Sequence, residues 1–316
     1  MAEKDWKRVL KADPTEWLLG EDNPPVRYYT MVDLLDMEPS DPEAQKTRSQ
    51  IAECELVREI FSQQKERTFW ERKDNFHAPH YTASVWQLTL LSDLGFTVKD
   101  ERILNGVEQV LSFQNDNGSF PGHNPQRCDV GAFDIGFIAR FMVKFGMSSD
   151  PRLSKIYEWM MKSQFPDGGW GGIEKVRKGQ RTSCFASTVN VLWGMAQCKD
   201  FVGSSAVKRA ADFLSNVGPQ KEFSYPQFWQ FWADDLKIAD ILSCLGFTLK
   251  DEALRTRVNT VLELQGKDGY WREIRGTYPT KPKNCAALRK LFPQKGMSSK
   301  WITLNAMRLM KRLYNK

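Results

Sequence analysis

The sequence predicts an all-α fold made of helical hairpins that repeat about every 50 residues. Three observations carry this prediction. A short motif, in which a glutamine is followed six positions later by an aromatic residue, recurs at a fixed spacing. A second motif around Leu-Gly-Phe-Thr recurs with the same underlying period. Between the motifs, apolar residues follow helical spacing, and no segment alternates with period two for long enough to predict a strand.

The first motif begins at a glutamine and ends at an aromatic residue. Gln114, Gln164 and Gln265 each lead into a polar turn that contains Asn-Gly or Asp-Gly, whereas Gln64 keeps the spacing without the glycine. The steps between successive glutamines are 50, 50 and 101 residues, so the last step spans two repeats, one of which has lost its motif near Asn216. The aromatic residues that end the motif are Trp70, Phe120, Trp170 and Trp271.

The second motif agrees with this period. Residues 94–101 and 245–252 differ at one position in eight, and Phe145-Gly146 occupies the equivalent place between them. Glycine is the preferred residue just beyond a helix C-terminus, because it adopts a left-handed backbone without steric cost. We therefore expect one helix of each repeat to end at this glycine.

Helical spacing predicts two series of helices within each period. The more apolar and aromatic series covers 81–94, 132–145, 184–197, 234–245 and 300–313, and the more charged series covers 101–114, 151–164, 204–216 and 251–265. One more pair lies upstream, over 26–37 and 43–63. Asp150-Pro151 is typical of a helix start, with an N-cap followed by proline in the first turn. Inner helices buried on all sides, surrounded by amphipathic outer helices, account for the difference between the series.

Length and composition limit the protein class. The chain has 316 residues, of which 41% are hydrophobic and 27% charged, so it can bury a large core and is not a disordered tail. Length alone favours two domains, but the repeat predicts a single domain over 1–316, with repeats from about residue 23 to 313 and a short extension over 1–22. No run of 18 apolar residues predicts a transmembrane segment.

Charge and cysteine content indicate the kind of ligand and the cellular compartment to expect. Lys and Arg total 45 against 39 Asp and Glu, and this excess of 6 is spread along the chain. It allows an anionic ligand without favouring nucleic acid. Residues 1–6 lack the basic-then-apolar pattern of a signal peptide, and the six cysteines form no Cys-x-x-Cys pair. We therefore expect a cytoplasmic protein with free thiols.

The Gln-x-x-Asp-Gly-x-Trp pattern over 164–170 resembles the QW motif of the squalene cyclase and protein prenyltransferase superfamily. The resemblance covers most of the chain, from about Asn23 to Met310. It implies an (α/α)6 toroid, with six inner helices around a central cavity and six outer helices around them. It also implies that the glutamine caps the next helix, which makes the motif structural. Residues 23–28 and 299–304 resemble small prokaryotic toroid proteins, a branch that implies no particular activity.

In such a toroid the N-termini of the inner helices, with the loops before them, converge at one end of the cavity, the mouth. Counting back from the glycine of each repeat predicts which chemically active side chains reach it. Asp134 and Asp234 are equivalent in register, two repeats apart. The residues predicted to lie at the mouth are His80, Cys128, Asp129, Asp134, Cys184, Asp234 and Asp235.

One chemistry open to this set is protonation of an isoprenoid. Protonating an alkene requires a strong acid in a site without water. A carboxylic acid in an apolar cavity can supply that proton, and aromatic walls then stabilise the carbocation that forms. Residues 231–235 resemble the Asp-x-Asp-Asp motif of class II terpene cyclases, with Trp232 where the first Asp stands. The alternative is that Asp234 only caps its helix. The catalytic candidates are Asp134, Asp234 and Asp235, and the aromatic candidates for substrate binding are Tyr81, Phe133, Phe185, Trp229 and Trp232.

The other chemistry is a metal site. Prenyltransferase β subunits bind zinc through an Asp, a Cys and a His at the toroid mouth, and these residue types suit zinc here. No Asp-x-Cys pair is present, and the order along the chain differs from that family. The alternative is that the cysteines pack as small hydrophobic residues. The metal candidates, for zinc or Mg²⁺, are His80, Cys128, Asp129 and Cys184.

Basic residues before two inner helices suit a diphosphate. Arg177 and Arg181 precede the helix expected at 184, and Lys281 and Lys283 lie in the loop before the last helix. Clustered cations at a cavity mouth bind phosphate oxygens through charge-assisted hydrogen bonds, and the alternative is a solvated loop.

Together these observations predict a toroid protein that binds an isoprenoid or lipid-like ligand, a hydrophobic small molecule with or without a diphosphate. The leading hypothesis is a terpene cyclase-like enzyme that uses an aspartate as general acid. The alternatives are a zinc-dependent prenyltransferase-like enzyme and a non-catalytic binding or scaffold protein, since a fold does not fix a function. The sequence does not predict the oligomeric state.

Overall fold

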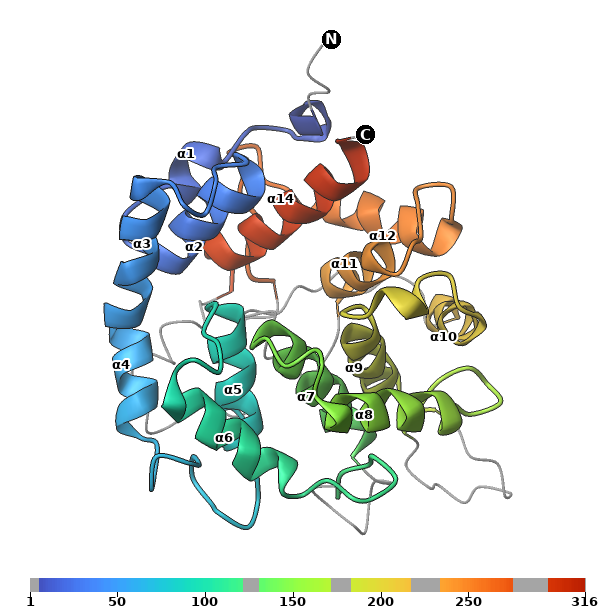
Figure 1. Cartoon of the computed structure of the whole chain (residues 1–316). Helices are drawn as coiled ribbons and strands as arrows, with labels where there is room; N and C mark the ends of the chain where they lie inside the picture. Colours follow the sequence, from blue (N-terminus) through green and yellow to red (C-terminus); the bar gives the residue numbers. More distant parts are fainter. Residues whose placement is uncertain (1–5, 122–130, 172–182, 217–233, 275–294, 316) are drawn as a thin grey trace. The chain divides into compact units, whose positions relative to one another are not determined.

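The computed structural model describes residues 6–121, 131–171, 183–216, 234–274 and 295–315 (Figure 1). These residues form α-helices, short 3₁₀ and π turns and three isolated β-bridges, and the described part of the chain contains no β-strand. The predicted all-α fold is confirmed. None of the described helices combines the length and the apolarity that a membrane crossing requires.

The chain divides into two compact units. The first combines Met1–Ser62, Pro219–Ser243 and Phe247–Lys316, and the second combines Gln63–Gly218 with Cys244–Gly246. Each unit contains helices of both predicted series. The single domain expected over the whole chain stays a prediction.

The inner helices of the second unit are α5 (Ser84–Asp93), α7 (Ala132–Lys144) and α9 (Phe185–Met195). Every residue of α5 is buried, as are all residues of α9 after Phe185. The first unit contains two helices of the same series, α11 (Asp235–Cys244) and α14 (Lys300–Tyr314). These bounds agree with the predicted apolar segments to within a few residues.

The outer helices bury only one face. They are α6 (Glu101–Leu111), α8 (Pro151–Lys162), α10 (Ser205–Ser215) and α12 (Glu252–Glu263). The Asp150 carboxylate accepts the backbone N–H of Arg152, so α8 starts at the cap and proline that the sequence indicated.

The glutamines of the repeat connect successive outer helices of the second unit. The Nε2 groups of Gln64, Gln114 and Gln164 donate to the carbonyl of the second residue of the following outer helix, at 2.9, 3.0 and 2.8 Å. In the first unit, Gln265 Nε2 donates to Ala12 O at 2.9 Å. The tryptophan of the motif then joins outer to inner helix: Trp170 donates its indole N–H to an α8 carbonyl and its backbone N–H to a hydroxyl on α9.

The upstream helices differ from the prediction. The segment expected over 26–37 forms α2 (Pro24–Tyr29) followed by a π turn, and the segment over 43–63 forms α3 (Pro42–Glu53) and α4 (Glu55–Ser62). Cys54 has an extended backbone, with ψ 150°, and so interrupts the helix predicted over 43–63. The break changes the helical phase, because α3 buries positions 44, 47 and 51 whereas α4 buries 57 and 60. The predicted N-terminal extension contains α1 (Thr15–Leu18) and a 3₁₀ turn, both packed on α14.

Two glycines allow α7 and α9 to approach closely. A Cβ at Gly136 would lie 1.8 Å from the backbone oxygen of Asn190, and a Cβ at Gly194 would lie 3.0 Å from the Gly136 Cα. The Asn190 side-chain amide donates to Phe133 O at 3.3 Å across the same contact. This contact fixes the N-terminal turn of α7, which carries Phe133 and Asp134.

Candidate functional site

A buried histidine–aspartate pair lies in the second unit, at the start of α7. His77 Nδ1 and Asp134 Oδ1 are 2.6 Å apart, and the two side chains are 1% and 0% exposed. Two titratable groups so close together and so fully removed from water are typical of functional sites.

Local structure fixes both residues. Asp134 lies in the first turn of α7 and donates its backbone N–H to Gly131, whose φ of +46° suits glycine. On the other side, Asn75 Oδ1 accepts the backbone N–H of His77 at 3.0 Å. The Trp86 indole on α5 donates to His77 O at 2.7 Å, which ties this turn to the inner helix.

Aromatic rings pack against the histidine of the pair. The Trp86 and Phe133 ring centroids lie 5.3 and 6.1 Å from that of His77. Phe137 extends this wall, at 5.5 Å from both Trp86 and Phe133, and Tyr81 packs on Trp86 at 5.6 Å. Aromatic faces attract positive charge, so this group of rings favours a cation near His77. We refer to the pair with Trp86, Phe133 and Phe137 as the His77–Asp134 site.

The two carboxyl oxygens of Asp134 differ in their contacts within the described structure. Oδ1 contacts His77, while Oδ2 is buried and has no hydrogen-bond partner within the described ranges. Buried polar atoms in native proteins nearly always have a partner. Oδ2 can therefore exchange a proton with a ligand while His77 holds the other oxygen.

The structure brings together four of the residues predicted from sequence, namely His80, Tyr81, Phe133 and Asp134. Asp134 and Phe133 belong to the His77–Asp134 site, and the half-buried His80 lies against it, with ring centroids of His80 and His77 at 5.0 Å. Tyr81 lies beside Trp86 with a left-handed backbone, φ +71°. Phe185 is half-buried at the first position of α9.

The other two predicted acids have structural contacts in the first unit. Asp234 Oδ1 accepts the backbone N–H of Lys237 at 2.8 Å, which is the contact of an N-cap at the start of α11. Asp235 forms a buried ion pair with Arg257 of α12, the two side chains being 0% and 4% exposed. A guanidinium beside a carboxyl group favours its charged form, so Asp235 is better suited to joining two helices than to donating a proton.

The predicted metal set is described only in part. Cys184 precedes α9, and its backbone N–H donates to Trp170 O at 3.0 Å. Within the described ranges, no three His, Cys, Asp or Glu side chains gather as a metal site would require. The predicted residues Cys128, Asp129, Arg177, Arg181, Trp229 and Trp232 lie outside the described residues.

His77 was not among the residues predicted from sequence. The chain has only three histidines, and counting back from Gly95 selected His80 instead. The available signal was Asn75 two positions before His77, because an asparagine there often bonds the backbone two residues on and fixes a turn. The sequence offered no way to pair position 77 with position 134.

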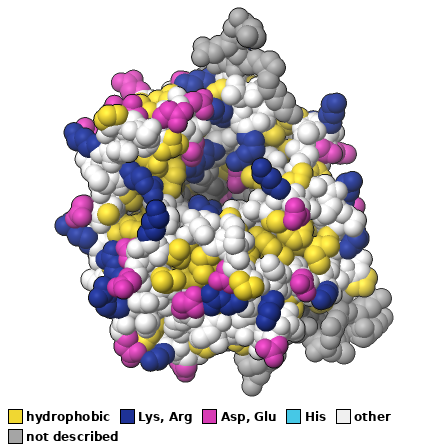
Figure 2. Space-filling view, in the orientation of Figure 1, with side chains coloured by type: hydrophobic (Ala, Val, Ile, Leu, Met, Phe, Trp, Pro, Cys, Tyr) yellow, Lys and Arg dark blue, Asp and Glu magenta, His cyan; other side chains and the backbone are white. Residues whose placement is uncertain are grey.

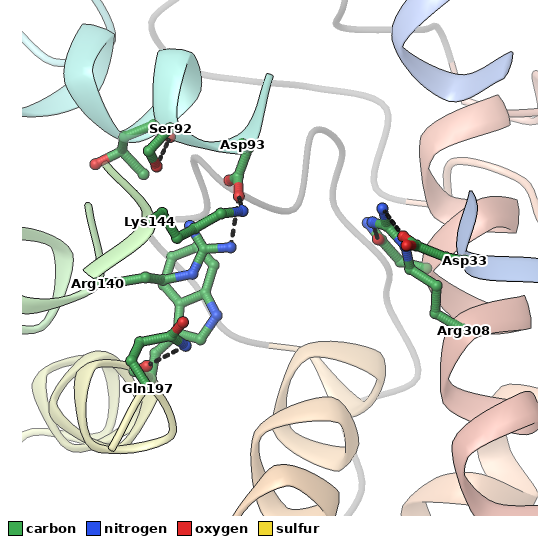
Figure 3. A network of polar contacts seen from close by, with 10 residues as sticks. Asp33, Ser92, Asp93, Arg140, Lys144, Gln197 and Arg308 are labelled. Atoms are coloured by element: carbon green, nitrogen blue, oxygen red, sulfur yellow. Dashed lines mark hydrogen bonds and ion pairs between the residues drawn. The ribbon is translucent and has the colours of Figure 1, made fainter. Parts of the chain in front are cut away.

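A second polar cluster lies near the C-terminal ends of α5 and α7 (Figure 3). Asp93 Oδ1 accepts from Arg140 Nη2 at 2.5 Å and from Lys144 Nζ. The Arg140 guanidinium lies 4.0 Å from the ring centroid of Trp193 on α9. We refer to Asp93, Arg140 and Lys144 as the Asp93 cluster. In the first unit, Arg308 on α14 pairs with Asp33 at 2.5 Å.

The Asp93 cluster predicts a loss of stability in acid. Burial raises the pKa of Asp93, but the charges of Arg140 and Lys144 outweigh it and leave this pKa below its ordinary value. A lowered native pKa stabilises the fold above the ordinary carboxyl pKa of about 3.9, and this contribution is lost as the pH falls through the native value. The difference in unfolding free energy between wild type and Asp93→Asn, from urea titrations, should be constant near neutral pH and shrink below about pH 4. A difference that grows on acidification would contradict this.

Charges on the described surface are mixed. On the face shown in Figure 2, lysine and arginine side chains are interspersed with aspartate and glutamate, so the described residues of this face form no large patch of one sign.

Residues 4–218 match the prenyltransferase alpha-alpha toroid domain. The chain belongs to this family, and its all-α fold is the α/α toroid. No curated protein matches the chain.

Solved structures with a similar fold are remote. They include a protein from Actinoplanes (13% identity, TM-score 0.45, 92% of this chain and 89% of that one). Another is an unsaturated glucuronyl hydrolase from Bacillus sp. GL1 (12%, TM-score 0.47, 95% and 87%). A third is the type II terpene cyclase MstE from Scytonema with its substrate geranylgeranyl dihydroxybenzoate (14%, TM-score 0.34, 84% and 97%). At these values the similarities carry no functional argument.

Proposed function

We propose that this toroid protein binds an isoprenoid or similar hydrocarbon ligand, and that Asp134 is the proton donor of a terpene cyclase-like reaction. The observation that supports the proposal is a buried carboxyl group with one oxygen on His77, whose ring packs against Trp86 and Phe133, and with the other oxygen lacking a partner among the described residues. Membership of the prenyltransferase toroid family agrees with a prenyl ligand.

The proposed step is balanced in protons and electrons. The acidic proton moves from Asp134 Oδ2 to one alkene carbon, the alkene π electrons form the new C–H bond, and the other carbon becomes a carbocation. The hydrogen bond from His77 stabilises the carboxylate that remains. We propose that the cation is stabilised by the rings of Trp86, Phe133 and Phe137, which pack on His77 and on one another, each contributing roughly 0.5–2 kcal/mol. Loss of a proton from the rearranged cation to Asp134 restores the acid, so the isomerisation needs no co-reactant.

Burial of the pair supports this chemistry. Asp134 is fully buried, which excludes bulk water that would otherwise capture a carbocation. All three acids predicted from sequence are buried, but in the described structure Asp134 contacts a histidine packed on aromatic rings, whereas Asp234 has an N-cap contact and Asp235 has an arginine. We therefore assign the acid role to Asp134.

The competing hypothesis is a non-catalytic binding protein in which the pair is structural. Asp134→Asn distinguishes the two, since the amide keeps the size of the side chain and can accept from His77 but is not an acid. We expect conversion of farnesyl or geranylgeranyl substrates, measured by product analysis, to fall about 10²–10⁴-fold without loss of ligand affinity.

The matched control is Asp212→Asn, an exposed aspartate on α10, which should leave conversion unchanged. Conversion by Asp134→Asn at the wild-type rate would rule out the acid role. A wild-type protein that binds these ligands without converting them would favour the binding hypothesis.

A further inference from the structure

The buried histidine–aspartate pair has a neighbour that reaches water. His77 and Asp134 are 1% and 0% exposed, so bulk water does not contact either side chain. His80 is half-buried, and its ring lies edge to face against that of His77, with ring centroids 5.0 Å apart and ring planes at 89°. His80 is thus a titratable residue that contacts the buried pair and keeps part of its own surface in water.

The backbone next to His80 is strained. Tyr81 has a left-handed φ of +71°, which is a true outlier for a bulky residue. Such a conformation persists only where the surrounding contacts hold it, and it is concentrated at functional sites. Here the Gln87 side-chain amide on α5 donates to Tyr81 O at 2.6 Å. The strain makes this turn a candidate for a role beyond packing.

Helix α5 holds both ends of the turn. The Trp86 indole donates to His77 O at one end, and the Gln87 amide donates to Tyr81 O at the other. The Trp86 ring also packs against both imidazoles, with centroids 5.3 Å from that of His77 and 5.5 Å from that of His80. These contacts keep the two histidine rings side by side.

This arrangement suits proton transfer. The half-buried His80 ring can rotate about its χ2 torsion, which is soft in histidine, and so turn a ring nitrogen toward His77. One bridging water between the two rings would serve equally well. Histidine has an ordinary pKa of about 6.5, so it takes up and releases protons near neutral pH.

The buried pair requires a path for protons. In the proposed reaction Asp134 begins as an acid, although its side chain is fully buried. A group that bulk water does not contact exchanges protons through a neighbouring group or when the structure opens locally. His77 uses Nδ1 to contact Asp134, so Nε2 is the ring nitrogen through which it can exchange a proton with another group.

We propose that His80 carries protons between water and the His77–Asp134 pair. This inference rests on the proposed function, which gives the transfer its purpose. His80 acts on the acid only through His77, and it is not itself a catalytic residue.

Each transfer moves one proton and no electrons. A proton from water binds one ring nitrogen of His80, and the other ring nitrogen gives its proton to His77 Nε2. His77 is then an imidazolium, and passing its Nδ1 proton to the carboxylate leaves a neutral acid beside a neutral imidazole. Rotation of the carboxyl group exchanges its two oxygens. Release of a proton follows the same path in reverse.

The test measures proton exchange without requiring turnover. The chain has three histidines, so ¹⁵N-histidine labelling of the full chain gives few NMR signals. We expect the His77 ring proton to exchange with water about tenfold or more slowly in His80→Phe than in wild type, because phenylalanine keeps an aromatic ring but has no nitrogen. His80→Gln, which is polar but does not titrate, should slow the exchange in the same way.

The backbone N–H of His77, which donates to Asn75 Oδ1, is the internal control for local opening. Its exchange should be the same in wild type and both His80 variants. Tyr81→Phe is the matched control, since it removes the neighbouring hydroxyl and should leave the exchange of the ring proton unchanged. Unchanged ring exchange in His80→Phe would overturn the proposal, as would equal slowing of the ring and backbone protons. Slow exchange in Tyr81→Phe instead would assign the transfer to Tyr81.

Product labelling in heavy water connects the relay to the proposed function. In wild type, Asp134 exchanges the proton recovered from the cation before the next turnover, so product from farnesyl or geranylgeranyl substrates should contain deuterium. In His80→Phe most of the product should lack it, and undiminished labelling would contradict the relay. If wild type converts neither substrate, the proposed function is rejected, and the NMR exchange rates alone decide whether His80 is the relay.

Discussion

Gly136→Ala is expected to destabilise the second unit by about 3 kcal/mol, at the upper end of what one added methyl group costs in a packed interior. The Cβ would lie 1.8 Å from the Asn190 carbonyl oxygen, and that oxygen belongs to the backbone of α9, which cannot rotate away as a side chain can. The two helices must separate or shift. Urea unfolding followed by circular dichroism measures the loss.

The matched control is Gly106→Ala in the outer helix α6. A Cβ there would lie close to the ends of two side chains, Trp70 Cζ3 at 3.1 Å and Leu88 Cδ2 at 3.2 Å, and in ordinary van der Waals contact with the backbone oxygen of Thr68 at 3.5 Å. Alanine also favours a helix over glycine by up to about 1 kcal/mol, so this variant should stay within about 1 kcal/mol of wild type. Equal stability of the two variants would contradict the close approach of α7 and α9.

The same contact links stability to the proposed chemistry. Asn190 donates to Phe133 O, and Phe133 precedes Asp134 in the first turn of α7. A shift of α7 away from α9 therefore displaces the acid relative to His77. For Gly136→Ala we expect conversion to fall further than the folded fraction alone accounts for, because displacing a reacting group by about 1 Å can cost about 10²-fold in rate.

The helices could be predicted because their signals are local. The apolar period over 132–145 and the glycine at 146 are enough to place α7, and Gly146 has the left-handed φ of +92° that its place after the helix requires. The break at Cys54 could not be predicted, because no proline or glycine marks it. It follows from which residues of α3 and α4 are buried, and burial depends on tertiary packing.

The candidate site could be predicted only in part. Register counting placed Asp134 at the start of an inner helix, which the structure shows, and treated Asp234 as its equivalent. Their partners differ, since Asp134 contacts the side chain of His77 while Asp234 accepts a backbone N–H of its own helix. A repeat fixes backbone positions, but partners come from loops such as 71–83, whose sequence does not repeat.

Breaking the buried ion pair of the first unit should have the largest effect on stability. Arg257→Leu removes the guanidinium and leaves the Asp235 carboxylate buried, with 0% of its side chain exposed. Removing one partner of a buried ion pair costs about 3–5 kcal/mol, well above the effect of losing a surface ion pair. Urea unfolding of the variant against wild type measures this cost.

The double variant Asp235→Ala plus Arg257→Leu removes both charges and should recover most of that loss, because desolvating an ion pair offsets much of its attraction. If the loss of stability in the double variant equals the sum of the losses in Asp235→Ala and Arg257→Leu, the two residues do not act as a pair.

Substitutions at Asp235 and Asp134 distinguish a structural aspartate from a catalytic one. Per folded molecule, Asp235→Asn should convert farnesyl or geranylgeranyl substrates like wild type, whereas Asp134→Asn should not. If Asp235→Asn abolishes conversion while retaining its fold, the acid is Asp235, and the histidine-paired carboxyl of α7 has only a structural role.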